Sequence, residues 1–270
     1  MHAGEHGCGG RLATRTTADA SLRGAPEAVR AGAGLLFDHA AQFFTATDPW
    51  FEALVDSWRQ RDLVHDWDGP VATVDAEGAE QCASLASAAP KVVAAGGMRA
   101  LAEQLSADVE AAGARVRRPC WVAGMAADQG KGWRLRATSR AAKGLDREVF
   151  DFVVIAHNGK CANRLLRPAG VPRVAAQMHA LRLSAVWVAM VAFRGAVATP
   201  HGWQGAFVSG NEVLAWAGNN TAKLGRSKPG IDALECWTLT STPAYGKRNK
   251  VPQENVPVEV ASKVRAPLVL

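Results

Sequence analysis

Apolar positions recur at helical spacing in three parts of the chain. In residues 48–61, Asp48 offers an N-cap oxygen and Pro49 suits the first helical position. Four apolar side chains then fall on one face of the predicted helix: Phe51, Leu54, Val55 and Trp58. A second helix is predicted between the Gly96-Gly97 pair and Gly113. Its apolar stripe consists of Met98, Leu101, Leu105 and Val109. A third helix is expected to begin near Asn255, because valines then recur every four residues.

Shorter apolar runs between turn residues predict strands. Residues 114–118, 121–127 and 133–139 have the pattern of a half-exposed antiparallel meander, with alternation clearest from Trp133 onward. Four more candidates are separated by Gly, Pro and Asn turns and predict a mostly antiparallel sheet: 181–194, 203–209, 212–218 and 235–242. Residues 150–155 are apolar almost without interruption, which predicts a strand buried on both faces of a parallel sheet.

Composition and charge narrow the function classes. The chain has 270 residues, 48% of them hydrophobic, so it can bury a substantial core. Its longest apolar run, residues 185–193, is shorter than the roughly 20 residues of a membrane helix, so we expect a soluble protein with no membrane partner. The five cysteines contain no CxxC pair, and we predict neither a metal site nor a disulfide framework. The formal charge of +6 is dispersed and accompanies no nucleic-acid-binding motif, so we expect no nucleic-acid partner.

Four segments, in order, resemble one family, the renalase-like branch of the flavin-containing amine oxidase superfamily, with its FAD/NAD(P)-binding oxidoreductases. GCGGRLATR (7–15) is similar to the family's glycine-rich segment beside the FAD pyrophosphate, and FDHAAQFFTATDPWF (37–51) resembles the FDHGAQYFTA stretch beside the flavin. GGMRALAEQL (96–105) and FDFVVIAHN (150–158) resemble the segments that return to the nucleotide-binding layer. LAWAGNNTAKLGRS (214–227) and WTLTSTPAY (237–245) resemble the substrate-domain pattern, with Leu224 at the usual proline of the turn. An ordered set is more specific than any single motif.

The resemblance implies a fold and its division into domains. We expect an α/β (α+β) protein with an incomplete FAD/NAD(P)-binding Rossmann-like layer and an interleaved, mostly antiparallel substrate-type sheet domain. The partial FAD-binding domain comprises residues 1–47 and 90–165, and the substrate-type domain residues 48–89 and 166–270. The sequence has no GxGxxG turn, and the family's closing Gly-Asp turn and final helix are also missing. We therefore expect the chain to be the middle of a flavoprotein.

The resemblance also assigns site residues. The expected FAD-binding residues are Gly9, Gly10, Arg11, Gln42, Phe43 and Val116. The expected substrate-side residues are Phe44, Trp216, Lys223 and Arg226. Each has an ordinary structural alternative, since tryptophans on strands are usually core and lone basic residues usually lie on the surface. No catalytic acid or base is assigned, because flavin carries the difficult chemistry itself.

Two functions follow as hypotheses. The first is an FAD-dependent oxidoreductase that transfers hydride to flavin from a small-molecule substrate, either a reduced nicotinamide or an amine, and that is inactive if the truncated chain cannot retain FAD. The alternative is a non-catalytic remnant that binds a ligand or a protein without FAD. A nucleic-acid-binding protein is a third hypothesis, with only charge in its favour. The oligomeric state and the compartment stay open, with a plastid as one candidate because of the related plant proteins.

Overall fold

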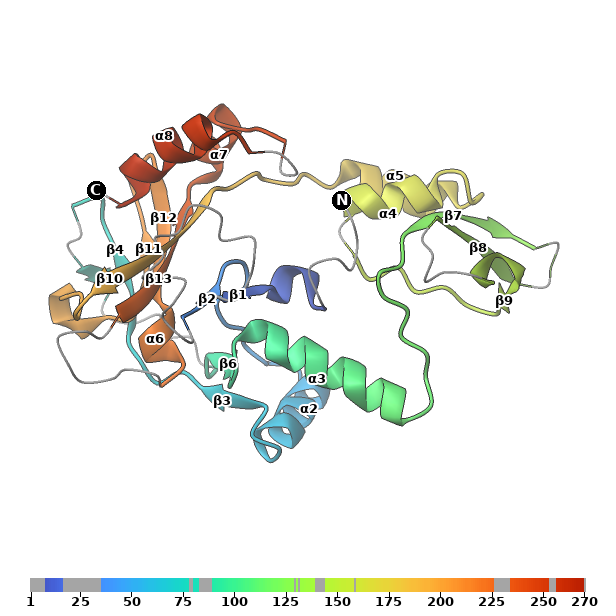
Figure 1. Cartoon of the computed structure of the whole chain (residues 1–270), viewed down its shortest axis with the longest axis horizontal. Helices are drawn as coiled ribbons and strands as arrows, with labels where there is room; N and C mark the ends of the chain where they lie inside the picture. The colour runs from blue at the N-terminus through green and yellow to red at the C-terminus, as the bar shows by residue number, and fades with distance from the viewer. Residues whose placement is uncertain are drawn as a thin grey trace. The chain divides into compact units, whose positions relative to one another are not determined.

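The computed structural model describes residues 8–16, 35–77, 80–82, 89–128, 130, 132–138, 144–157, 159–225, 234–252 and 256–269. These residues form a mixed α/β structure with several separate sheets (Figure 1). The chain divides into two compact units. The first comprises Met1–Gly10 and Ser106–Leu183, and the second comprises Arg11–Leu105 and Ser184–Leu270.

A six-stranded sheet forms the body of the second unit, in the order β10-β13-β12-β11-β4-β5. Its strands are β4 (Val71–Val74), β5 (Glu80–Cys82), β10 (Val188–Arg194), β11 (Gly205–Val208), β12 (Leu214–Asn219) and β13 (Leu234–Ser241). Strands β10 to β13 pair antiparallel, whereas β4 runs parallel to β11. The four strands predicted between residues 181 and 242 are thereby confirmed, and so is their antiparallel pairing.

Helices of the second unit begin where the sequence predicts. Helix α2 (Pro49–Arg59) is capped by the Asp48 carboxylate, which accepts a hydrogen bond from the Phe51 amide at 3.1 Å. Helix α3 (Met98–Ala111) begins directly after the glycine pair, and the chain leaves it through Gly113 at φ 90°. Helix α8 (Val258–Val269) packs against β10 and β13 (Figure 1) and buries Val264.

Four short strands and two short helices complete the second unit. Strand β1 (Thr14–Thr16) pairs antiparallel with β2 (Leu36–Asp38), and β3 (Val64–Asp66) pairs antiparallel with β6 (Val92–Ala94). The short helices are α6 (Asn220–Lys223) and α7 (Pro243–Arg248), and the 3₁₀ turns are η1 (Gly10–Leu12) and η4 (Pro200–Gly202). The described residues 11–16 and 35–47, expected in the FAD-binding part, therefore lie in one compact unit with the antiparallel sheet.

The first unit is a small antiparallel meander with two helices. Strands β7 (Val122–Ala127), β8 (Trp133–Ala137) and β9 (Val149–Phe150) pair in that order, and η3 (Leu145–Arg147) precedes β9. Helix α4 (Gly159–Leu166) packs against both α5 (Pro172–Ala180) and β7. Exposure alternates along β8, which confirms the predicted half-exposed meander.

Two predictions in the first unit are wrong. Residues 114–118, expected as a strand, belong to no helix or strand. Arg115 and Arg117 instead form ion pairs with Glu148, just before β9. The predicted buried strand of residues 150–155 is limited to β9, and Phe152 and Val154 are 87% and 88% exposed. An apolar run is buried on both faces only if other elements cover both, and the described residues cover one.

Helix length also bears on the membrane question. Within the described ranges, no helix is long and apolar enough to cross a membrane.

Candidate functional site

The candidate site of the second unit is built around Asp38, the last residue of β2. Pairing of β1 with β2 places Thr14 opposite Asp38, and the Thr14 hydroxyl donates to Asp38 Oδ1 at 2.6 Å. The same oxygen accepts from the backbone amide of Met98 at 2.9 Å, at the start of α3. The Asp38 side chain is fully buried, so its charge is stabilised by these donors and by the positive end of the α3 dipole.

Lys223 supplies the counter-ion of Asp38. Its Nζ donates to Asp38 Oδ2 at 2.8 Å and to the main-chain oxygen of Gln42 at 3.0 Å. The side chains of Lys223 and Asp38 are 1% and 0% exposed. Burial lowers the pKa of Lys223, because it penalises the charged ammonium, and the Asp38 carboxylate partly offsets this effect.

A second ring of hydrogen bonds holds the backbone around Asp38. The Asn220 side chain accepts from the Asp38 amide at 3.0 Å and donates to Thr238 Oγ1 at 2.8 Å. The Thr238 hydroxyl in turn donates to the Asp38 carbonyl at 2.9 Å, and Gln42 Nε2 donates to the same carbonyl at 2.6 Å. We call this set the Asp38 network; its members are Thr14, Asp38, Gln42, Asn220, Lys223 and Thr238.

Local contacts fix the turn that carries Lys223. Asn219 caps the single-turn helix α6 and accepts from the Ala222 amide at 3.0 Å. Leu224 is buried, and the following Gly225 has φ 61°. The turn therefore closes without proline and directs Lys223 inward.

An aromatic cluster of the second unit consists of Phe43, Trp67 and Trp216. Phe43, one residue after Gln42, lies 5.8 Å from Trp67 and 6.1 Å from Trp216, measured between ring centroids. Trp67 Nε1 donates to Gln204 Oε1 at 2.8 Å, whereas Trp216 Nε1 is buried and has no hydrogen-bond partner among the described residues. The three rings therefore form a buried aromatic cluster, in which the Trp216 indole N–H lacks a partner among the described residues.

The Trp67 and Trp216 rings pack tightly on glycine. A Cβ on Gly205 would lie 2.8 Å from Trp67 and 2.9 Å from Trp216, and a Cβ on Gly218 would lie 2.9 Å from Trp216 Nε1. Because β11 and β12 pair Gly205 with Gly218, the indole of Trp216 rests on a strand pair that has no side chains there. Glycine at both positions is thus a packing requirement.

Four of the predicted site residues come together in the second unit: Gln42, Phe43, Trp216 and Lys223. Phe44 lies next to Phe43 in sequence, but its ring packs with Phe51 and Trp58 in the core beneath α2. Arg11 is exposed, and its carbonyl accepts from the Ala41 amide at 3.0 Å. Residues 11–16 therefore lie beside residues 36–41.

The remaining predicted residues lie elsewhere. Gly9 and Gly10 belong to the first unit and have φ angles of 99° and 50°. Val116 is half-buried in the irregular stretch of the same unit. Arg226 lies outside the described residues.

Sequence reasoning missed Thr14, Asp38, Asn220 and Thr238. The sequence offers one local signal for Asp38, which directly follows the apolar residues Leu36 and Phe37. In the structure all three residues are buried. Thr238 and Thr14 are ordinary strand residues in the sequence. Only the packing of distant segments shows that they share one carboxylate.

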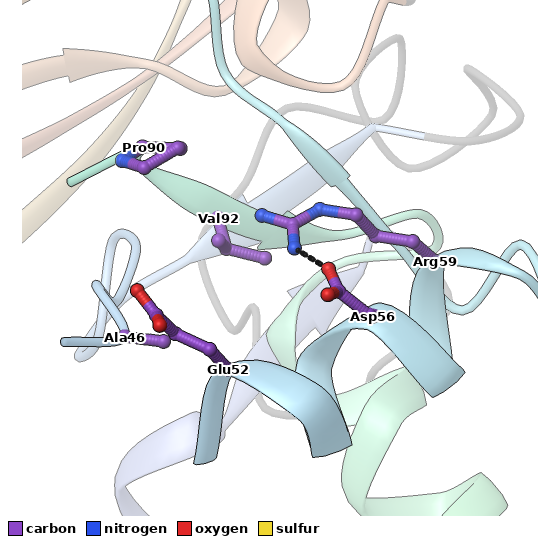
Figure 2. Close-up of a pocket in the computed structure, with 6 residues that line it drawn as sticks. All are labelled: Ala46, Glu52, Asp56, Arg59, Pro90 and Val92. Carbon is purple, nitrogen blue, oxygen red and sulfur yellow. Dashed lines mark hydrogen bonds and ion pairs between the residues drawn. The ribbon is translucent and has the colours of Figure 1, made fainter. Parts of the chain in front are cut away.

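A small cavity lies apart from the Asp38 network, between α2 and the start of β6 (Figure 2). Its volume is about 180 Å³, and its lining consists of Ala46, Glu52, Asp56, Arg59, Pro90 and Val92. Arg59 already pairs with Asp56 at 2.7 Å and with Asp66 at 2.6 Å. Ligand pockets usually exceed roughly 300 Å³, so this cavity suits a packing role better than a cofactor.

Two further findings concern metal binding and similarity to known proteins. In the parts of the chain that the structure describes, no three His, Cys, Asp or Glu side chains gather as a metal site would require. No protein-family model and no curated protein matches the chain.

Proposed function

We propose that the chain belongs to an FAD-dependent oxidoreductase of renalase-like type, which transfers hydride from a reduced nicotinamide or an amine to flavin. One observation carries the proposal: residues of all the resembling segments except 150–158 meet at the Asp38 network. Thr14 comes from the glycine-rich segment, Asp38 and Gln42 from the flavin-side segment, and Met98 from the GGM segment. Asn220, Lys223 and Thr238 come from the substrate-domain segment.

This convergence supports the proposal because each motif by itself is common. Four weak motifs that were unrelated would have no reason to share one buried charge. Burying an ion pair costs desolvation free energy, which only well-placed partners offset. The Asp38 network joins residues of the glycine-rich, flavin-side, GGM and substrate-domain segments within the second unit, whereas residues 150–157 lie in the first unit.

One local feature fits an FAD molecule. The space that a Cβ on Gly10 would occupy is open, so a pyrophosphate can approach the backbone there, and Gly9 has a left-handed φ beside it. The cluster of Phe43, Trp67 and Trp216 is instead part of a core: both indole rings pack on Gly205, and Trp216 Nε1 packs on Gly218.

The roles proposed here stay within the second unit. Arg11 would contact the pyrophosphate, and Gln42 and Phe43 would contact the flavin, as the resemblance implies. Bound FAD would supply hydride acceptance, with reoxidation by oxygen. Lys223 would position the flavin-side segment, since its ammonium donates to the Gln42 carbonyl.

Retention of FAD tests the proposal. The purified 270-residue chain is incubated with excess FAD, freed of unbound cofactor and examined by absorbance. We expect a retained flavin spectrum, and we expect Arg11→Ala to weaken FAD binding at least about tenfold by removing a charge-assisted contact. Arg173→Ala, which removes an exposed arginine on α5, is the matched control and should bind FAD like the wild type. A folded chain that retains no flavin contradicts the proposal.

One observation favours the alternative, a domain that binds a partner without FAD. Phe152 and Val154 are large apolar side chains that are almost fully exposed, and exposed apolar surface often marks an interaction site. A retained flavin in the same experiment would exclude the alternative, which predicts a folded chain without flavin.

A further inference from the structure

Helices α4 and α5 form an antiparallel pair in the first unit (Figure 1). The Leu181 side chain, directly after α5, packs against Gly159 at the start of α4, so the end of one helix lies beside the start of the other. The buried contact between the helices includes Leu166 and Ala175. We call residues 159–182 the α4–α5 hairpin.

The hairpin carries positive charge without any carboxylate to compensate it. Its exposed arginines are Arg164, Arg167, Arg173 and Arg182. No aspartate or glutamate occurs in residues 152–211, a stretch that contains the whole hairpin. The positive charge of the chain, which looks dispersed in the sequence, is therefore unbalanced on this surface.

The arginines of the hairpin differ in their partners from three other arginines of the first unit. Arg115 and Arg117 pair with Glu148, and Arg134 pairs with Asp128. Within the described ranges, the four exposed side chains of the hairpin form no ion pair and no hydrogen bond. Guanidinium groups bind the oxygens of carboxylates and phosphates, so the matching chemistry is an anionic surface outside the chain.

The same hairpin exposes apolar side chains. Val174 and Leu181 are 43% and 53% exposed. They are seven positions apart, which is about two helical turns, so they lie on one side of α5. Among the nine residues of α5, only Ala175 is buried. A short helix that is attached by a narrow stripe and exposes both apolar and basic side chains has the pattern of an interfacial amphipathic helix.

We propose that the α4–α5 hairpin binds the surface of an anionic membrane. The four arginines contact the anionic lipid headgroups, and Val174 and Leu181 enter the boundary between the headgroups and the acyl chains. Clusters of about four to eight basic residues on an amphipathic helix are typical of binding sites for anionic lipids. The proposal does not depend on FAD binding.

The exposed apolar side chains favour a lipid surface over nucleic acid. A nucleic-acid backbone offers phosphates to the arginines, but it offers no apolar phase to Val174 and Leu181. The sequence-based expectation of no membrane partner rests on the length of the apolar runs, which decides whether a segment can span a bilayer. Binding to a membrane surface depends instead on exposed charge and exposed apolar area, which the fold determines.

Co-sedimentation of the full chain with lipid vesicles tests the proposal. We expect binding to phosphatidylcholine vesicles that contain about 30% phosphatidylserine, and much weaker binding to vesicles of phosphatidylcholine alone. Binding should weaken as the salt concentration rises, because salt screens exposed charges. A chain that binds neither kind of vesicle, or binds both equally, overturns the proposal.

Charge variants test whether the hairpin is the surface that binds. Arg173→Gln and Arg182→Gln should each weaken binding to the anionic vesicles about fivefold, because each removes one basic group from the membrane surface. Arg147→Gln is the matched control, since it removes the same charge from an exposed arginine of the same unit outside the hairpin. It should bind like the wild type, and an equal loss in Arg147→Gln would contradict the assignment to the hairpin.

Val174→Ser separates a lipid surface from other anionic partners. It keeps the charge and removes exposed apolar area, so binding to the anionic vesicles should fall at least about threefold. Unchanged vesicle binding would contradict the role given to Val174. Duplex DNA and poly-glutamate are the alternative probes, and tighter binding of either one than of the anionic vesicles would assign the arginines to nucleic acid or to an acidic protein and overturn the proposal. Circular dichroism checks that each variant keeps its helices.

Discussion

Substituting Asp38 by Asn breaks the buried ion pair with little change of side-chain shape. The Asn oxygen can still accept from Thr14 and Met98, which now bond to Asp38 Oδ1. Both the negative charge and the acceptor 2.8 Å from Lys223 Nζ disappear, because the NH₂ donor of Asn takes the place of Oδ2. Lys223 then stays in a site that is almost completely buried and has lost its counter-ion.

The expected loss of stability is large. Removing one partner of a buried ion pair costs about 3–5 kcal/mol, because the remaining charge is uncompensated. The double variant Asp38→Asn/Lys223→Met removes both charges and should recover a substantial part of that loss. Asp56→Asn is the matched control in the same unit, because it breaks an exposed pair with Arg59, and exposed pairs contribute less than about 1 kcal/mol.

The pH dependence gives a second signature of the same variant. Burial already lowers the pKa of Lys223, and the Asp38 carboxylate counteracts this effect, so its removal lowers the pKa further. Over the pH range in which Lys223 is neutral in the folded variant but charged in the unfolded chain, the unfolded state binds more protons. Stability then rises with pH, by about 1.4 kcal/mol per pH unit. The deficit of Asp38→Asn relative to the wild type should therefore shrink as the pH rises from neutrality toward the ordinary lysine pKa.

Urea unfolding followed by tryptophan fluorescence measures both effects. Seven of the nine tryptophans report on the second unit, because only Trp121 and Trp133 lie in the first. An Asp38→Asn chain within about 1 kcal/mol of the wild type, with an unchanged pH dependence, would refute the role given to the buried pair.

Three other predictions concern single elements. Asp48→Ala removes the N-cap of α2 and should lower the free energy of unfolding by about 1 kcal/mol, measured by urea unfolding. Gly205→Ala drives a methyl group into two indole rings and should cost about 1–3 kcal/mol, whereas Gly124→Ala, with 3.4 Å to a flexible side chain, should stay within roughly 0.5 kcal/mol. Amides of residues 152–155 should exchange faster than those of β13, because β9 ends at Phe150, and equal protection would contradict that boundary.

Elements whose cause is local could be predicted from sequence. The N-cap of α2 depends on residues three apart, Asp48 and Phe51, so the pattern of the segment was enough to predict where the helix starts. The antiparallel strands β10 to β13 also followed from short apolar runs between turns. Segment 150–155 failed because burial of a strand depends on its neighbours, which its own residues do not specify.

The candidate site shows the same limit. Phe43 and Trp216 were expected near the site, and their rings do share a cluster. The resemblance assigned Phe44 to the substrate side, but neighbouring residues of an extended chain point to opposite sides, and its ring lies in another core. Local sequence could not separate these two phenylalanines.

By itself, the sequence determined the periodic elements, since helix caps and apolar spacing act within a few residues. Only the tertiary structure decided that Asp38 is shared by Asn220, Lys223 and Thr238, which are 182, 185 and 200 residues away along the chain. A buried carboxylate needs several donors at once, and the donors that meet it are chosen by how the sheet and helices pack.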